Sequence, residues 1–425
     1  MLRKKYVIPL VVILCLCVLF VSFQRKRNFS KANTQSEEDE IMKLNREIRR
    51  QGLKWVAGKT SMTMLPPEER RKMLGYIPTP YVDPSEILIV EAPETPTVYL
   101  DYRNWNGFDW TTPPKNQSTC NSCWAFTLMG AFESMYKLEH NLPNAWPDGS
   151  EMILVRCSGA GSCAAGGSYW DAAGWMITNG AAPESCYPYT PTDGACSACA
   201  NYPANAWRIT DRQWITGFPA NITNVKNALQ QIGPVMCGFK VYPSFYNYTG
   251  GVYSPLQGEE MEGWHAVVVI GFSDEDEAWI CKNSWGTGWG DNGFFMMTWN
   301  TTSPDLEIRD FVAITGTSLQ NSAPVLDAVG NKETKEGVKL EIQLSATDPD
   351  GNPLTYSCTN KPDGASFNTA TGLFSWTPSY TQGSTATNIY YKDYSVTFGV
   401  SDGILSDSEA INIRVYNRKR TKGRF

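Results

Sequence analysis

Hydrophobic and polar positions divide the chain into stretches of different pattern. An uncharged apolar run, Tyr6–Phe23, lies between two basic clusters near the N-terminus, which is typical of an export signal. Ile41, Leu44 and Ile48 then recur at helical spacing among charged residues, which predicts a short amphipathic helix. Several prolines between residues 78 and 96 interrupt any regular element after it.

The middle of the chain, from about Val98 to Gly316, mixes helical and strand patterns. A helix-forming apolar stretch runs from Ser122 to roughly His140, and glycine-rich loops follow it. Ala266–Ile270 is a β-branched run of the kind found in buried strands. This mixture predicts an α+β domain.

Beyond Ser318 the pattern becomes that of an all-β domain. Strand-type runs occur at Glu341–Ser345, Phe374–Trp376, Tyr394–Val400 and Ala410–Val415. Asp-Gly and Pro-Asp-Gly turns separate them. We therefore expect a β-sandwich at this end of the chain.

Length and composition agree with two folded units. A chain of 425 residues exceeds what one core usually organises, and its 42% hydrophobic content excludes a disordered polymer. The net charge of -6, with no long basic block outside the termini, argues against nucleic acid as a partner. We interpret residues 418–425 as a solvated basic tail.

The predicted export segment, residues 1–30, has two interpretations. Its apolar run of 18 residues is at the lower limit for spanning a bilayer, and no convincing small-x-small cleavage site follows it. A retained signal anchor is slightly favoured over a cleaved signal peptide. The protein is then exported, and is either anchored in a membrane or secreted.

Three short motifs in the α+β stretch carry candidate chemistry. Gln117 and Cys123 lie in Gln-Ser-Thr-Cys-Asn-Ser-Cys-Trp, His265 in Gly-Trp-His-Ala, and Asn283 and Trp285 in Lys-Asn-Ser-Trp-Gly. An ordinary thiol is mostly protonated at neutral pH, so a nucleophilic cysteine needs a group that stabilises its thiolate. The start of a helix and a nearby imidazolium both do so, which makes Cys123 a candidate nucleophile.

The order and spacing of these motifs resemble the papain family of cysteine peptidases. The resemblance covers roughly residues 98–317 and implies a two-lobed fold with a helical lobe and a β-barrel lobe. It also implies that Cys123 attacks peptide bonds to give a thioester acyl-enzyme, with His265 as base. Asn283 would orient the imidazole, Gln117 would bind the oxyanion, and Trp285 would shield the bond between His265 and Asn283. This chemistry acts on polypeptides and requires no cofactor.

Two other functions remain open. A catalytically inactive relative could serve as a binding or adhesion protein at the cell surface. A different Cys–His acyl transferase, such as a transglutaminase, could use the same two side chains. The presence of Gln117, Cys123, His265 and Asn283 together favours the peptidase, because decayed relatives usually lose one of them.

Nine of the twelve cysteines fall between Cys120 and Cys281, and export favours disulfides. The resemblance implies the three pairs Cys120–Cys163, Cys157–Cys196 and Cys186–Cys199. Six cysteines allow many arrangements, so these pairs rest on the resemblance alone. Cys237 and Cys281 are expected to be small buried hydrophobic residues within strands.

The resemblance also implies substrate-binding residues. Gly166 and Gly167 resemble the family's glycine pair that lets a substrate backbone approach, although they could simply form a tight turn. Gly238 would line the S2 pocket, which holds the P2 side chain of a substrate, and Asp310 would lie at its base and accept a basic side chain. A surface ion pair between Arg309 and Asp310 is the alternative.

Within the family the chain most resembles cathepsin B, in Gly-Pro-Val-Met-Cys-Gly and in the lead segment around Trp55. Cathepsin B trims dipeptides through an occluding loop with paired histidines, and this chain has only two histidines in all, so we expect an endopeptidase. Residues 31–97 would be an inhibitory propeptide and linker, cut off near Glu94 to Leu100. A permanent linker helix is the alternative.

The β-rich end, residues 320–417, resembles Ig-like and cadherin-like modules of bacteria and archaea. Such modules often bind a cell-surface ligand or act as spacers, although a shared fold does not identify the ligand. Asp348, Asp350 and Asp402 are candidate calcium ligands, and a metal-free role in turns is favoured over that.

Overall fold

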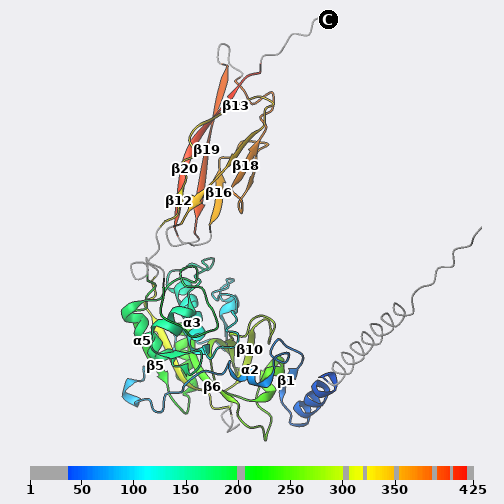
Figure 1. Cartoon of the computed structure of the whole chain (residues 1–425), viewed down its shortest axis with the longest axis vertical. Helices are drawn as coiled ribbons and strands as arrows, with labels where there is room; N and C mark the ends of the chain where they lie inside the picture. The colour runs from blue at the N-terminus through cyan, green and yellow to red at the C-terminus, as the bar shows by residue number, and fades with distance from the viewer. Residues whose placement is uncertain are drawn as a thin grey trace, which may run out of the picture.

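A computed structural model describes residues 37–198, 206–299, 306–318, 323–348, 354–384, 390–402 and 405–418 (Figure 1). The predicted export segment lies outside these residues, as do all but one of the residues of the predicted basic tail. Among the residues described, no helix is both long enough and apolar enough to span a bilayer.

One lobe of the peptidase-like domain is built on helices. They are α3 (Cys123–Glu139), α4 (Glu151–Cys157) and α5 (Tyr169–Asn179). Every residue of α3 from Cys123 to Lys137 is buried, because α4, α5 and strand β8 all pack against it. This explains why the predicted helix is apolar on all sides rather than amphipathic.

The other lobe is a sheet with strand order β1-β7-β10-β9-β8-β6-β11-β5, and β2 pairs with β8. The bounds are β2 (Tyr99–Asp101), β5 (Asp211–Thr216), β6 (Val235–Val241), β7 (Tyr248–Tyr253), β8 (Gly263–Ser273), β9 (Ala278–Lys282), β10 (Phe294–Thr298) and β11 (Arg309–Thr315). The lobe also holds α6 (Ile222–Gln231), and the short elements η2 (Tyr102–Asn104), η3 (Pro243–Asn247), β3 (Gly161–Ser162) and β4 (Gly166–Gly167) complete the domain. The predicted α+β fold is confirmed.

The lead segment before this domain is folded against it. Residues 37–50 are helical, and they are followed by β1 (Lys54–Ala57), α2 (Pro67–Arg71) and η1 (Pro84–Glu86). β1 pairs antiparallel with β7 and so extends the sheet of the β lobe by one strand. Ile48 in the helix is buried, as the amphipathic pattern predicts. The lead segment therefore shares the core of the domain.

The C-terminal unit is a set of short sheets with its own core. Its strands are β12 (Val325–Leu326), β13 (Lys332–Lys335), β14 (Leu340–Gln343), β15 (Ala346–Thr347), β16 (Thr355–Thr359), β17 (Ser366–Asn368), β18 (Leu373–Trp376), β19 (Tyr391–Ser401) and β20 (Ser406–Tyr416). A four-stranded sheet, β13-β20-β19-β16, and a three-stranded sheet, β14-β18-β17, enclose Phe374, Trp376 and Phe398. The alternating runs of the sequence supply these inward side chains.

Trp55 of β1 offers a test of how firmly the lead segment is attached. It is buried, with its ring 5.1 Å from that of Tyr253, whereas the neighbouring Val56 is 56% exposed. We expect Trp55→Ala to lower the free energy of unfolding of the domain by about 3–5 kcal/mol, because it leaves a large cavity. Urea unfolding followed by circular dichroism measures this. Val56→Ala is the matched control, and an equal effect of both changes would contradict the packing described.

Candidate active site

Cys123 is the first residue of α3 and is completely buried. Its sulfur lies at the positive end of the helix dipole, as the sequence predicts. Burial nevertheless raises the pKa of the thiol to about 11, opposed by the backbone N–H groups of Ala266, Gly75, Trp124 and Cys123 itself. The thiol is therefore protonated at neutral pH in this state of the chain.

His265 and Asn283 meet because β8 and β9 are neighbours, with Val268 paired to Lys282. Nε2 of His265 is 2.8 Å from Oδ1 of Asn283, and both residues are buried. Helix α3, which begins at Cys123, packs against β8, which carries His265, and the backbone of Ala266, the residue after His265, lowers the pKa of the Cys123 thiol.

The imidazole of His265 is enclosed. The Trp285 ring lies over it, with 4.8 Å between ring centroids. Burial lowers the pKa of His265 to about 4, opposed by the hydrogen bond with Asn283 and by the Met73 backbone. The imidazole is therefore neutral at neutral pH, as the Cys123 thiol is, and its Nδ1 is buried without a hydrogen-bond partner.

Gln117 is held beside the same group of residues by Ser284. The Gln117 N–H donates to the Ser284 carbonyl at 2.9 Å, and the Ser284 hydroxyl donates to Oε1 of Gln117 at 2.7 Å. Nε2 of Gln117 donates to the carbonyls of Cys120 at 2.8 Å and Met73 at 3.2 Å. A carbonyl of the lead segment thus occupies the donor that an oxyanion would need.

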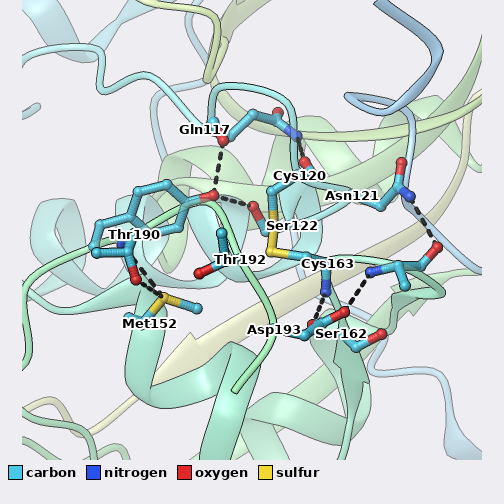
Figure 2. Close-up of a disulfide and its surroundings, with 12 residues drawn as sticks. Gln117, Cys120, Asn121, Ser122, Met152, Ser162, Cys163, Thr190, Thr192 and Asp193 are labelled. Carbon is cyan, nitrogen blue, oxygen red and sulfur yellow. Dashed lines mark hydrogen bonds between the residues drawn. A yellow bond between two sulfur atoms is a disulfide. The ribbon is translucent and has the colours of Figure 1, made fainter. Parts of the chain in front are cut away.

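The glycine loop is fixed by a disulfide, Cys120–Cys163, which Figure 2 shows together with its surroundings. Asp193 accepts the N–H groups of Cys163 at 2.7 Å and Ala164 at 3.0 Å, just before Gly166 and Gly167. This bonding anchors the loop beside the start of α3.

The other cysteines fall into two groups. Cys157 and Cys196 form a second disulfide; Cys186 is also disulfide-bonded, and Cys199 lies outside the described residues. Cys237 and Cys281 are free and buried within β6 and β9.

The lead segment runs between the two lobes as an extended strand. The Gly75 carbonyl accepts the Gly167 N–H at 2.8 Å, and the Ile77 N–H donates to the Gly167 carbonyl at 3.0 Å. The Tyr76 N–H donates to the Trp264 carbonyl at 3.2 Å, and a Cβ on Gly166 would come within 2.2 Å of the Gly75 carbonyl. The glycine pair therefore admits the backbone of the lead segment at close range, and its contact with a substrate backbone stays a prediction.

Gly238 and Asp310 both contact the side chain of Tyr76. The Tyr76 hydroxyl donates to Oδ2 of Asp310 at 2.7 Å, and a Cβ on Gly238 would collide with the Tyr76 ring. Nε of Arg309 lies 3.2 Å from Oδ1 of Asp310, so the two residues do pair, but Asp310 is completely buried and the pair is not the surface ion pair given as the alternative. No motif in the sequence identifies Tyr76, because its role depends on where the lead segment crosses the domain.

A buried polar cluster next to Asn283 was also missed. Lys282 donates to the Thr112 hydroxyl at 2.6 Å, and that hydroxyl in turn donates to the Glu133 carboxylate. Nζ of Lys115 lies 2.9 Å from the same carboxylate. The one signal in the sequence is a glutamate within the apolar stretch of α3, where an unpaired charge would be costly.

Two of the three candidate calcium ligands, Asp348 and Asp402, lie among the residues that the structure describes. Over the described ranges of the chain, no group of three His, Cys, Asp or Glu residues could hold a metal ion. Asp402 accepts the Leu405 N–H at 2.6 Å in a turn, and Asp350 lies outside the described residues. The metal-free turn role favoured from the sequence stays a prediction.

Comparison with known proteins agrees with this geometry. Residues 97–314 match the model of the papain family of cysteine proteases, and residues 323–416 match a putative Ig domain. The chain belongs to the papain family. It is a cysteine-type peptidase that carries a C-terminal Ig-like domain, and the fold expected from the sequence is confirmed.

Several relatives are cathepsins. Cathepsin Z of Onchocerca volvulus is 30% identical over 215 residues, which are 47% of this chain and 69% of that protein. Cathepsin J of Mus musculus is 33% identical over 246 residues, which are 54% of this chain and 69% of that protein. Digestive procathepsin L2 of Tenebrio molitor is a solved structure with a TM-score of 0.58 and 26% identity, covering 74% of this chain and 96% of that one. These relatives do not single out cathepsin B, and that likeness stays a prediction, as does a bacterial or archaeal origin of the Ig-like module.

The buried thiol leads to a kinetic prediction. Because its pKa is about 11, Cys123 in the intact chain should react with iodoacetamide at pH 8 at least about a hundredfold more slowly than an unperturbed thiol. Peptide mass spectrometry over time measures the rate at this one residue. The same chain in urea is the control, and equal rates in the two conditions would contradict a closed site.

Proposed function

We propose that the protein is a cysteine endopeptidase made as a zymogen, with Cys123, His265, Asn283 and Gln117 as its catalytic residues. The observation that carries the proposal is the hydrogen bond between His265 and Asn283 on the lobe that faces Cys123. Papain-family membership gives the reaction class. On this proposal each of the four side chains has a separate task.

In the open enzyme the Cys123 proton moves to His265, and the thiolate attacks the carbonyl carbon of the scissile bond. The oxyanion accepts from Nε2 of Gln117 and from the Cys123 N–H. The imidazolium then gives its proton to the leaving amine, the C–N bond breaks and a thioester remains. Water, deprotonated by His265, attacks the thioester and releases the thiolate and the acid product.

The lead segment is, on this proposal, an inhibitory propeptide. It covers the Gln117 amide, the pocket beside Gly238 and the Cys123 thiol. The Met73 carbonyl takes the amide of Gln117, and the Tyr76 ring lies against Gly238. The Gly75 backbone lowers the pKa of the Cys123 thiol, as an N–H donor near the sulfur would. On this proposal, Cys123 does not cleave the lead segment at this position.

Residues 31–97 are assigned to this propeptide and its linker. The Val90 N–H donates to Oδ1 of Asn224 at 2.8 Å, and the Thr97 N–H donates to Oε1 of Gln230 at 2.8 Å. Residues 91–96 between them are mostly exposed, which suits cleavage near Glu94 to Leu100. We assign residues 98–317 to the peptidase and 320–417 to the Ig-like domain.

Internal cleavage is favoured over dipeptide trimming. The second histidine, His140, ends α3 and bonds through Nε2 to the Thr317 carbonyl at 2.7 Å. It therefore has a structural partner, and the chain has no further histidine for an occluding loop. The Ig-like domain is assigned the binding of a cell-surface ligand or the spacing of the enzyme, and residues 1–30 are assigned export, with membrane anchoring or secretion as the two outcomes.

Covalent labelling tests the nucleophile. After removal of the lead segment, an epoxide inhibitor of the papain family should label wild type once per chain and should not label Cys123→Ala, because the epoxide alkylates the activated thiolate. Intact-mass measurement gives the stoichiometry. Cys358→Ala, which removes a half-buried free cysteine of the Ig-like domain, should label like wild type. Undiminished labelling of Cys123→Ala would remove the assignment, and wild type that neither labels nor cleaves peptides would favour a binding role.

Acid should weaken the binding of the lead segment over the site. The pKa of His265 is about 4 when covered and ordinarily about 6.5, so the covered state binds fewer protons between these pH values. The contribution of His265 to the stability of the covered state, relative to the uncovered state, is fully present above pH 6.5. It is lost as the pH falls toward 4. In Cys123→Ala, which cannot cut itself, backbone hydrogen exchange of residues 73–79, corrected for intrinsic rates, should be more than tenfold faster at pH 4.5 than at pH 7. His265→Gln cannot titrate and should flatten this dependence. An unchanged dependence in that variant would assign the effect to other groups.

A further inference from the structure

The Tyr76 side chain fills a slot between the two lobes. One wall is Gly238, where a Cβ would lie only 2.1 Å from Cε1 of Tyr76. The other wall is the Tyr169 ring, stacked on that of Tyr76 with 4.8 Å between centroids and 4° between planes. Tyr76 is buried as a result. The slot therefore has the thickness of one aromatic ring.

The base of the slot is a carboxylate held in place by its backbone. Asp310 is completely buried and has a φ of 59°, at an irregularity where β11 shifts register against β6 between Arg309 and Val312. Such a left-handed residue within a strand turns its side chain out of the regular alternation. The Tyr169 hydroxyl donates to the Asp310 carbonyl at 2.5 Å and fixes this conformation. The carboxylate is thereby directed at the ring in the slot.

The hydrogen bonds of Asp310 favour a neutral donor over a cation. Oδ1 already lies 3.2 Å from the Arg309 guanidinium, so its charge is paired. Oδ2 accepts the Tyr76 hydroxyl at 2.7 Å and the Thr79 N–H at 3.0 Å. A second cation in the slot would meet an anion that is already neutralised, next to a like charge. A phenol hydroxyl brings no charge and satisfies the buried acceptor.

From this geometry we infer that the peptidase selects a tyrosine side chain at the substrate position that pairs with Gly167, the P2 position. Tyr76 pairs in parallel with Gly167 and follows Gly75, which lies against Cys123, so the slot is one residue away from the nucleophile. Asp310 and Gly238 are the residues that set the preference. The inference rests on the proposed function and replaces the basic P2 side chain expected from the sequence.

Fluorogenic dipeptides that differ only at P2 test the inference. With arginine at P1 throughout, kcat/KM of the activated enzyme should be about 10- to 100-fold higher for tyrosine than for phenylalanine, because only tyrosine satisfies the Asp310 carboxylate. Leucine should rank below phenylalanine, and arginine below both. Equal rates for tyrosine and phenylalanine, or a higher rate for arginine, would overturn it.

Variants link the preference to the slot. Asp310→Asn keeps a residue type that tolerates a positive φ and should reduce the ratio of tyrosine to phenylalanine several-fold. Glu307→Gln, which contacts Arg309 but not the slot, should leave that ratio unchanged. An unchanged ratio in Asp310→Asn would overturn the role of the carboxylate. If every peptide is uncleaved and Cys123 stays unlabelled, the proposed function fails and the inference fails with it, whereas cleavage without preference defeats the inference alone.

Discussion

The contact between the start of α3 and strand β8 is the constraint on which the rest of the structure depends. It brings Cys123 of one lobe against the backbone beside His265 of the other. The buried bonds that link Glu133, Thr112 and Lys282 join the same helix to β9, directly before Asn283. Because breaking a buried ionic cluster leaves an uncompensated charge, this cluster resists separation of the lobes. A small shift of α3 would therefore disturb both Cys123 and Asn283, the proposed nucleophile and the proposed orienter of the base.

The same burial explains why an intact chain can be inert. A thiolate and an imidazolium both lose hydration in a closed site, so the pKa of Cys123 rises and that of His265 falls. The chemistry needs both charges, and burial disfavours both, whereas the lead-segment backbone at Gly75 and Met73 shifts each pKa in the opposite direction. If the lead segment is the propeptide proposed above, latency depends on solvent exclusion as much as on steric blockage.

Much of the fold and the core of the site could be predicted from the sequence. Attack on a peptide bond requires particular residue types, and Cys123, His265 and Asn283 appear in motifs that fix their order. The strands of the C-terminal domain alternate clearly because each has one buried face. The partners of Asp310 could not be predicted, because its positive φ and its contact with Tyr76 arise from a register shift and from the path of a distant segment.

Tyr76 gives a physical link between latency and selectivity. A propeptide and a substrate compete for the same slot, so contacts that hold one side chain of the cover describe what the slot accepts. The parallel pairing with Gly167 lets Tyr76 enter the slot while the Gly75 carbonyl accepts the Gly167 N–H at 2.8 Å. The chain can therefore use the side chain that its own slot binds well and still avoid cutting itself there. Stronger binding in the slot would strengthen both inhibition by the lead segment and selection of the P2 side chain. The reason is that the stacking on Tyr169 and the hydrogen bond to Asp310 would bind either tyrosine.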